Sequence, residues 1–186
     1  MPNDNASPID PTRDHVLRTY LHAKDLSRLH LLAEAFTEDA VFTSRLNFAE
    51  RWMDDQTAAG LAQITETFRG LGRGFENIYT VYTPESVETQ GDELICRWLV
   101  GMSARDGGEV HVAWGDYRWR FAQDRATRLD VVMEGAATLS PGRLREVMSW
   151  LRALPSIWCP GARLLSGAPQ DPSLELMRAY FEADAR

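Results

Sequence analysis

Alternating apolar and polar positions dominate the middle of the chain, between residues 75 and 134. They fall into four runs separated by short turn sequences, and the runs are Phe75–Thr89, Glu93–Ser103, Glu109–Phe121 and Thr127–Met133. Alternation with a period of two is typical of strands, and breaks rich in Gly and Asp are typical of hairpins. The pattern therefore predicts four successive antiparallel strands.

Apolar residues recur at helical spacing before this stretch. Asp10-Pro11 supplies an N-cap and a first-turn proline ahead of one apolar stripe, and Asp25 can cap a shorter second helix. A third stripe, from Leu61 to Phe68, ends in a run of glycines. Between the second and third stripes, residues 37–44 are rich in β-formers and predict a short strand.

The last fifty or so residues return to helical spacing. Helix starts occur at Ser140-Pro141 and Asp171-Pro172, each followed by an apolar stripe. Because an amphipathic helix must bury its apolar side, this part must dock on something. We therefore divide the chain into a flexible tail (1–9), a domain (10–136) and a C-terminal helical extension (137–186) that packs on the domain or on a dimer partner.

Side-chain parity on the third strand separates two faces of the sheet, since successive side chains point to opposite sides. One set should face the helices: His111, Ala113, Gly115, Tyr117, Trp119 and Phe121. The other set is apolar at one end and charged at the other: Val110, Val112, Trp114, Asp116, Arg118 and Arg120. This second set suits an outer face that another subunit partly covers, so we expect a homodimer.

Composition and charge narrow the choice of partners. The chain has 186 residues and a formal net charge of −7, which argues against nucleic acid or a membrane as partner. Its two cysteines and the lack of a secretory leader predict reduced thiols in the cytoplasm. No metal-ligand spacing, Gly-rich phosphate loop or nucleophile elbow occurs, so neither a metal nor another cofactor is expected.

The order of these elements resembles the nuclear-transport-factor-2-like superfamily, and within it the SnoaL-like group that includes polyketide cyclases. The resemblance rests on two helices, the segment Phe36–Phe42, a third helix near Gly60 and four strands, with Gly91-Asp92 and Gly115-x-Tyr117 as shorter shared features. It covers about residues 10–136. It implies an α+β fold in which a curved antiparallel sheet packs on the N-terminal helices to form a cone around a largely apolar cavity.

The resemblance implies a mixed set of site residues. Where ketosteroid isomerases carry a carboxylate near the end of the first strand and a tyrosine in the first helix, this chain has Ser44 and Leu17. At the position of their protonated aspartate it has Tyr117, which can also donate to an oxyanion. Of the Asp-Arg-Asp relay of the related epoxide hydrolases, only the arginine, Arg97, is present.

His111 is then the best candidate base, because it is the histidine on a strand and has inward parity. The alternative for His111 is a satisfied core or rim histidine. Arg97 either polarises or binds a substrate group together with Tyr117, or pairs structurally with Glu134 or Asp130. We take His111, Tyr117 and Arg97 as candidate catalytic residues.

Candidate substrate-binding residues come from the helices and strands expected to line the cone: Leu17, Tyr20, Phe42, Ser44, Trp52, Phe68 and Trp119. Aromatic residues at such spacings also build cores. Two functions fit these residues. One is a protein that binds a hydrophobic, oxygenated small molecule and acts as a cofactor-free cyclase, isomerase or dehydratase. The other is a non-catalytic ligand-binding or dimerisation module of the same fold.

Overall fold

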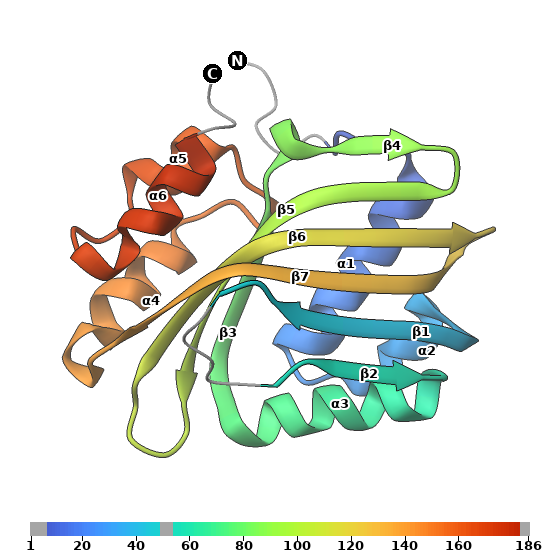
Figure 1. Cartoon of the computed structure of the whole chain (residues 1–186), viewed down its shortest axis with the longest axis horizontal. Helices are drawn as coiled ribbons and strands as arrows, with labels where there is room; N and C mark the ends of the chain where they lie inside the picture. The colour runs from blue at the N-terminus through green and yellow to red at the C-terminus, as the bar shows by residue number, and fades with distance from the viewer. Residues whose placement is uncertain (1–6, 49–53, 183–186) are drawn as a thin grey trace.

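The computed structural model describes residues 7–48 and 54–182, and they form one curved mixed sheet with helices on both faces (Figure 1). The strand order is β2-β1-β7-β6-β5-β3-β8, with β4 paired to β5. The strands are β1 (Phe36–Leu46), β2 (Gln56–Ala59), β3 (Phe75–Tyr82), β4 (Glu88–Gln90), β5 (Glu93–Ala104), β6 (Val110–Ala122), β7 (Arg125–Leu139) and β8 (Ile157–Trp158). The helices are α1 (Pro11–Asp25), α2 (Leu32–Ala35), α3 (Leu61–Gly74), α4 (Leu144–Arg152), α5 (Gly161–Ser166) and α6 (Glu175–Glu182).

The predicted meander is present, because β3, β5, β6 and β7 pair antiparallel in that order. Two details differ from the prediction. The first predicted strand is split into β3 and β4 by a 3₁₀ turn at Pro84–Ser86, as proline cannot donate to a ladder. The sheet is mixed rather than wholly antiparallel, because β1 runs parallel to β7 and β8 runs parallel to β3.

The inner face of the sheet packs on α1, α2 and α3. On β6 this face carries Ala113, Tyr117, Trp119 and Phe121, in agreement with the predicted parity. Tyr20 of α1 is a hub of this core, since its ring makes edge contacts with Phe36, Phe68, Tyr117 and Trp119. Aromatic rings therefore fill much of the space between the helices and the sheet.

A β-bulge at Glu134 lets the long strand β7 serve both faces. The pairing steps from Trp114↔Gly135 to Gly115↔Met133, which leaves Glu134 without a ladder partner. Before the bulge, Met133 points into the inner core, and after it Ala137 belongs to the outer cluster. A bulge shifts the alternation of side chains between the two faces of a strand. Strand β7 continues past the bulge to Leu139, beyond the predicted end at residue 133.

The outer face is covered at one end by the chain's own C-terminal extension. Figure 1 shows α4, α5 and α6 gathered at one end of the sheet, away from α3. Trp114 and Leu99 of the sheet share a buried cluster with Leu151 of α4 and Phe181 of α6. A Cβ on Gly101 of β5 would overlap the side chain of Leu151, so the extension uses this glycine as a docking point. Dimerisation through the rest of the outer face stays a prediction.

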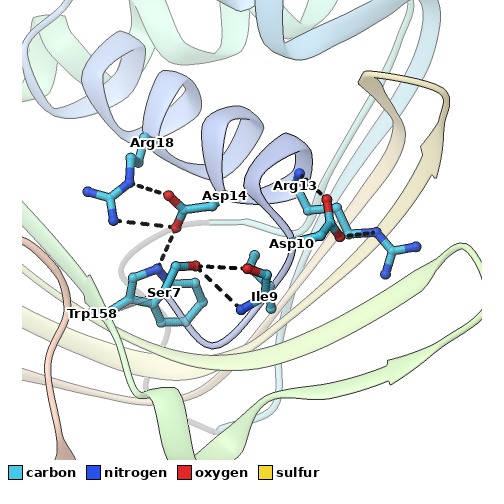
Figure 2. Close-up of polar contacts among 7 residues, drawn as sticks. All are labelled: Ser7, Ile9, Asp10, Arg13, Asp14, Arg18 and Trp158. Atoms are coloured by element: carbon cyan, nitrogen blue, oxygen red, sulfur yellow. Dashed lines mark hydrogen bonds and ion pairs between the residues drawn. The ribbon is translucent and has the colours of Figure 1, made fainter. Parts of the chain in front are cut away.

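Asp14 joins α1 to the C-terminal extension (Figure 2). Its carboxylate accepts a hydrogen bond of 2.5 Å from Arg18 Nε and one of 2.7 Å from Trp158 Nε1 in β8. Burial acts to raise the pKa of Asp14, but the donors from Arg18 and Trp158 outweigh it and hold the pKa below its usual value. The ionised form of Asp14 therefore stabilises the fold.

We expect Asp14→Asn to lower the free energy of unfolding by about 1–3 kcal/mol at pH 6, because the variant loses charge-assisted hydrogen bonds. A carboxyl whose pKa is depressed by folding contributes stability above its unfolded pKa, close to 3.8, and loses it as the pH falls through the folded pKa. Urea unfolding at pH 6 and at pH 3 should therefore show the gap between wild type and variant narrowing in acid. Glu66→Gln, at the exposed pair with Arg69, is the control and should change stability little. A gap of equal size at both pH values would contradict the assignment.

Candidate functional site

A small cavity of ≈ 80 Å³ lies between α1, α3 and the inner face of the sheet. Most of its lining is apolar, and the polar side chains among it are Tyr20, Lys24, Ser44, Trp98 and Tyr117. The remaining lining residues are Phe42, Phe68, Leu71, Ile78, Val100, Met102, Val131 and Met133. The cavity is large enough for a small functional group but not for a whole drug-sized ligand.

A larger pocket of ≈ 610 Å³ lies next to this cavity, between β1, β2 and α3. Phe42, Ser44, Phe68 and Leu71 line both spaces. Polar residues from β2, from α3 and from the position just before β2 make up much of the rest of its lining, and they are Asp55, Gln56, Thr57, Glu66 and Thr67. Its volume is in the range of small-molecule sites, so it can hold the body of a ligand whose end enters the small cavity.

Two tyrosines bring their hydroxyl groups together in the small cavity. Tyr20 Oη donates to Tyr117 Oη at 3.4 Å, and both residues are fully buried. Burial raises the pKa of Tyr20 and the pKa of Tyr117 well above the usual tyrosine value. Both phenols are therefore protonated at neutral pH and can act as hydrogen-bond donors.

Lys24 adds a cation to the wall of the cavity. Its ammonium donates to the carboxylate of Asp25 and, at 2.6 Å, to Thr80 Oγ1. Asp25 in turn accepts from Thr80 N at 2.8 Å and from Thr80 Oγ1 at 3.0 Å. The ammonium is thus held in a fixed polar cluster, and its charge is balanced inside the protein.

Sequence reasoning missed Lys24, although a signal was available. Lys24 follows Tyr20 by four residues in the first helix, so both side chains lie on one helix face. It is also the only lysine of the chain. Trp98 was missed as well, and it alternates with Cys96 and Val100 on the inner side of β5.

Five of the ten predicted site residues meet at this cavity: Tyr20, Phe42, Ser44, Phe68 and Tyr117. Leu17 and Trp119 are fully buried in the aromatic core and do not line the cavity. Trp52 lies outside the residues that the structure describes.

Arg97 lies on the opposite face of the sheet from Tyr117, so the structure does not bring these two candidates together. Its Nη1 donates to the Tyr180 carbonyl oxygen at 2.9 Å, and its guanidinium lies 4.5 Å from the centroid of the Tyr180 ring. Tyr180 Oη donates to Asp116, the residue opposite Arg97 in the ladder. The expectation that Arg97 acts together with Tyr117 is therefore wrong. In the ladder Cys96 pairs with Tyr117, so Arg97 faces outward and contacts Tyr180 of α6.

His111 has the expected inward parity but lies far along β6 from the tyrosine pair. Six residues separate it from Tyr117, which is about 20 Å along a strand. His111 Nδ1 lies 3.1 Å from Thr138 Oγ1, and its ring makes an edge contact with Phe75. Burial lowers its pKa, although Glu109 opposes this effect. The structure therefore places His111 away from the tyrosine pair, and a catalytic role for His111 stays a prediction.

Within residues 7–48 and 54–182, His, Cys, Asp and Glu side chains form no group of three that could hold a metal ion. None of the helices in this part of the chain has the length and apolarity needed to span a membrane.

A family model described as a SnoaL-like domain matches residues 14–128. A search of curated proteins finds no match. Among solved structures, a protein with a ketosteroid isomerase-like fold from Catenulispora acidiphila, solved with trimethylamine, is 13% identical with a TM-score of 0.52, and the match covers 62% of this chain and 82% of that chain. A nuclear-transport-factor-2-like protein of unknown function from Burkholderia pseudomallei is 14% identical with a TM-score of 0.53, over 65% of this chain and 89% of that chain.

An epoxide hydrolase from M. tuberculosis is 9% identical with a TM-score of 0.50, over 66% of this chain and 83% of that chain. At these identities the matches show a shared fold, and they say nothing about activity. They confirm the fold that the sequence predicted, and they leave the chemistry to be argued from the residues of this cavity.

Proposed function

The chain belongs to the SnoaL-like domain family, and we propose that it binds an apolar small molecule carrying an oxygen atom. The observation that carries this proposal is that the larger pocket and the small cavity adjoin each other and share lining residues. The ≈ 610 Å³ pocket offers room for an apolar body, and the ≈ 80 Å³ cavity offers buried hydroxyl donors.

In the proposed complex the apolar body of the ligand contacts Phe42, Phe68 and Leu71, which line both spaces. Its oxygen reaches the hydroxyl pair of Tyr20 and Tyr117. Neutral phenols in a low-dielectric site form strong hydrogen bonds to a carbonyl oxygen and polarise it. This arrangement accounts for both the apolar lining of the cavity and the buried hydroxyl pair among its lining residues.

A cofactor-free proton transfer, such as isomerisation, cyclisation or dehydration, is the second candidate function. The hydroxyl of Tyr117, which accepts a hydrogen bond from Tyr20 and can donate its own proton to a ligand oxygen, favours it, because enolate-like intermediates need such donors. Proton abstraction also needs a base. The described residues that line the small cavity include no carboxylate and no histidine. Ligand binding is therefore the function that the site supports best.

We expect Ser44→Leu to weaken ligand binding about tenfold, because the larger side chain would fill the junction between the two spaces. The probe is cyclohexyl methyl ketone, and binding is followed through the methyl NMR signals of Met102 and Met133, which line the cavity. Thr43→Leu is the matched control, since Thr43 is equally buried on the same strand and lines neither space. Methyl signals that do not move with the probe, or equal weakening in both variants, would overturn the proposed function.

A further inference from the structure

The small cavity has more buried hydrogen-bond donors than the protein satisfies. Trp98 lines the cavity and is 2% exposed, and its Nε1 has no acceptor among the described residues. An ammonium offers three donors, and among the described residues Lys24 donates to Asp25 and Thr80. A buried donor without an acceptor destabilises a protein, because it has lost its hydrogen bonds to water. Lys24 and Trp98 therefore fit an acceptor atom brought by a ligand.

The two donors lie against the tyrosine pair. The Trp98 ring stacks on the Tyr117 ring, with centroids 5.0 Å apart and an interplanar angle of 28°. Lys24 lies one helical turn after Tyr20, whose hydroxyl donates to Tyr117. Trp98, Lys24 and the two tyrosines thus all line one space of ≈ 80 Å³. Such a space suits a single acceptor group with its nearest carbon atoms.

The charges of Lys24 and Asp25 determine which kind of ligand group can bind in the cavity. The ammonium of Lys24 is balanced by Asp25, whose carboxylate is also held by two hydrogen bonds from Thr80. A ligand carboxylate would add a second negative charge beside Asp25 in a mostly apolar space, which is costly. A neutral carbonyl accepts the same hydrogen bonds without adding charge. A hydrocarbon leaves the donors unsatisfied.

We propose that Lys24 and Trp98 are the specificity-determining donors of this site, and that they select a neutral carbonyl group over both a carboxylate and a hydrocarbon. The proposal rests on the proposed function, since it names the group of the ligand that enters the small cavity. Asp25 and Thr80 act as positioning residues, because they fix the ammonium and balance its charge.

Three probes of similar shape test the proposal: cyclohexyl methyl ketone, cyclohexanecarboxylate and isopropylcyclohexane. Because Lys24 is the only lysine of the chain, labelling with ¹⁵N-lysine gives a single side-chain ammonium signal. The ketone should shift this signal together with the methyl signals of Met102 and Met133. The ketone should also bind about tenfold more tightly than either other probe. Methyl shifts without any shift of the Lys24 signal would overturn the proposal and leave the proposed function standing.

Trp98→Phe removes the indole N–H and keeps an aromatic ring on Tyr117. We expect this variant to bind the ketone about five- to tenfold more weakly and the hydrocarbon unchanged. Trp119→Phe is the matched control, because Trp119 Nε1 is also buried with no acceptor in the described part of the chain, but Trp119 does not line the cavity. Equal ketone affinity in these two variants would overturn the role of Trp98.

Lys24→Met alone would leave Asp25 as a buried unpaired charge, so its folding is at risk. The double variant Lys24→Met, Asp25→Asn removes both charges and provides the second test. It should lose the preference for the ketone over the hydrocarbon by about five- to tenfold. An unchanged preference in a folded double variant would overturn the role of Lys24. Methyl signals that no probe moves would overturn the proposed function and this proposal together.

Discussion

Gly115→Ala is expected to lower the free energy of unfolding by about 3 kcal/mol, with a fall in Tm of about 6–12 °C. A Cβ at this position would overlap the carbonyl oxygen of Val132 and lie 2.9 Å from the backbone nitrogen of Glu134. Both contacts are to backbone of the neighbouring strand, which cannot rotate away as a side chain can. The ladder between β6 and β7 must therefore separate next to the bulge, two residues from Tyr117.

Thermal unfolding followed by circular dichroism measures the change. Gly70→Ala is the control, because Gly70 lies within helix α3 and a Cβ there meets no atom within 4 Å. Alanine in a helix is favoured over glycine by roughly 0.5–1 kcal/mol, so this variant should be slightly more stable than wild type. If Gly115→Ala unfolded at the wild-type temperature, the close approach of β7 to Gly115 would be wrong.

The parts of the fold that sequence predicts well are those set by neighbouring residues. The Gly- and Asp-rich turns fix the hairpins between β5, β6 and β7, and the alternation on β6 places Tyr117 and Trp119 on the inner face. The parallel pairing of β1 with β7 joins residues such as Ser44 and Val131 that are far apart in the chain. Nothing in either local pattern specifies that partner, and so the mixed sheet was not predicted.

The candidate site residues divide in the same way, into those that local sequence patterns predict and those that only tertiary contacts reveal. Tyr20, Phe42 and Phe68 were predicted because each lies on the apolar side of a recognisable element, and Ser44 and Tyr117 because they occupy positions that matter in the resembling ketosteroid isomerases. Lys24 was missed because a lysine near a helix end is usually solvated, and only the tertiary contact with Thr80 shows that it is buried. Arg97 was misplaced because the register between β5 and β6, which decides its face, is a property of the pair of strands.

On the outer face, the register between β5 and β6 brings together the residues that hold the C-terminal extension. The ladder pairs Arg97 with Asp116, and Tyr180 of α6 contacts both side chains. These polar contacts border the apolar cluster that contains Trp114 and Phe181. Because the same strands line the cavity on their inner side, the extension and the cavity share one sheet. Loss of the extension should therefore lower the stability of the whole domain.

Phe181→Ala tests this coupling and is expected to lower the free energy of unfolding by about 3–5 kcal/mol. Phe181 is fully buried, and its removal leaves a cavity among the residues that hold the extension on the sheet. Because the extension and the domain share the sheet, we expect one cooperative transition shifted to lower denaturant rather than two. Urea unfolding monitored by tryptophan fluorescence and by far-UV circular dichroism makes the measurement.

Leu176→Ala is the matched control, since Leu176 lies on the same helix but is 76% exposed. Substitution of such a surface residue should change stability by no more than about 0.5 kcal/mol. The difference between the two variants isolates the buried contact from any change in helix propensity. An early, separate transition in Phe181→Ala, with the main transition unmoved, would mean that the extension unfolds independently of the sheet. The C-terminal helices would then be an appendage rather than part of the cooperative unit that supports the cavity.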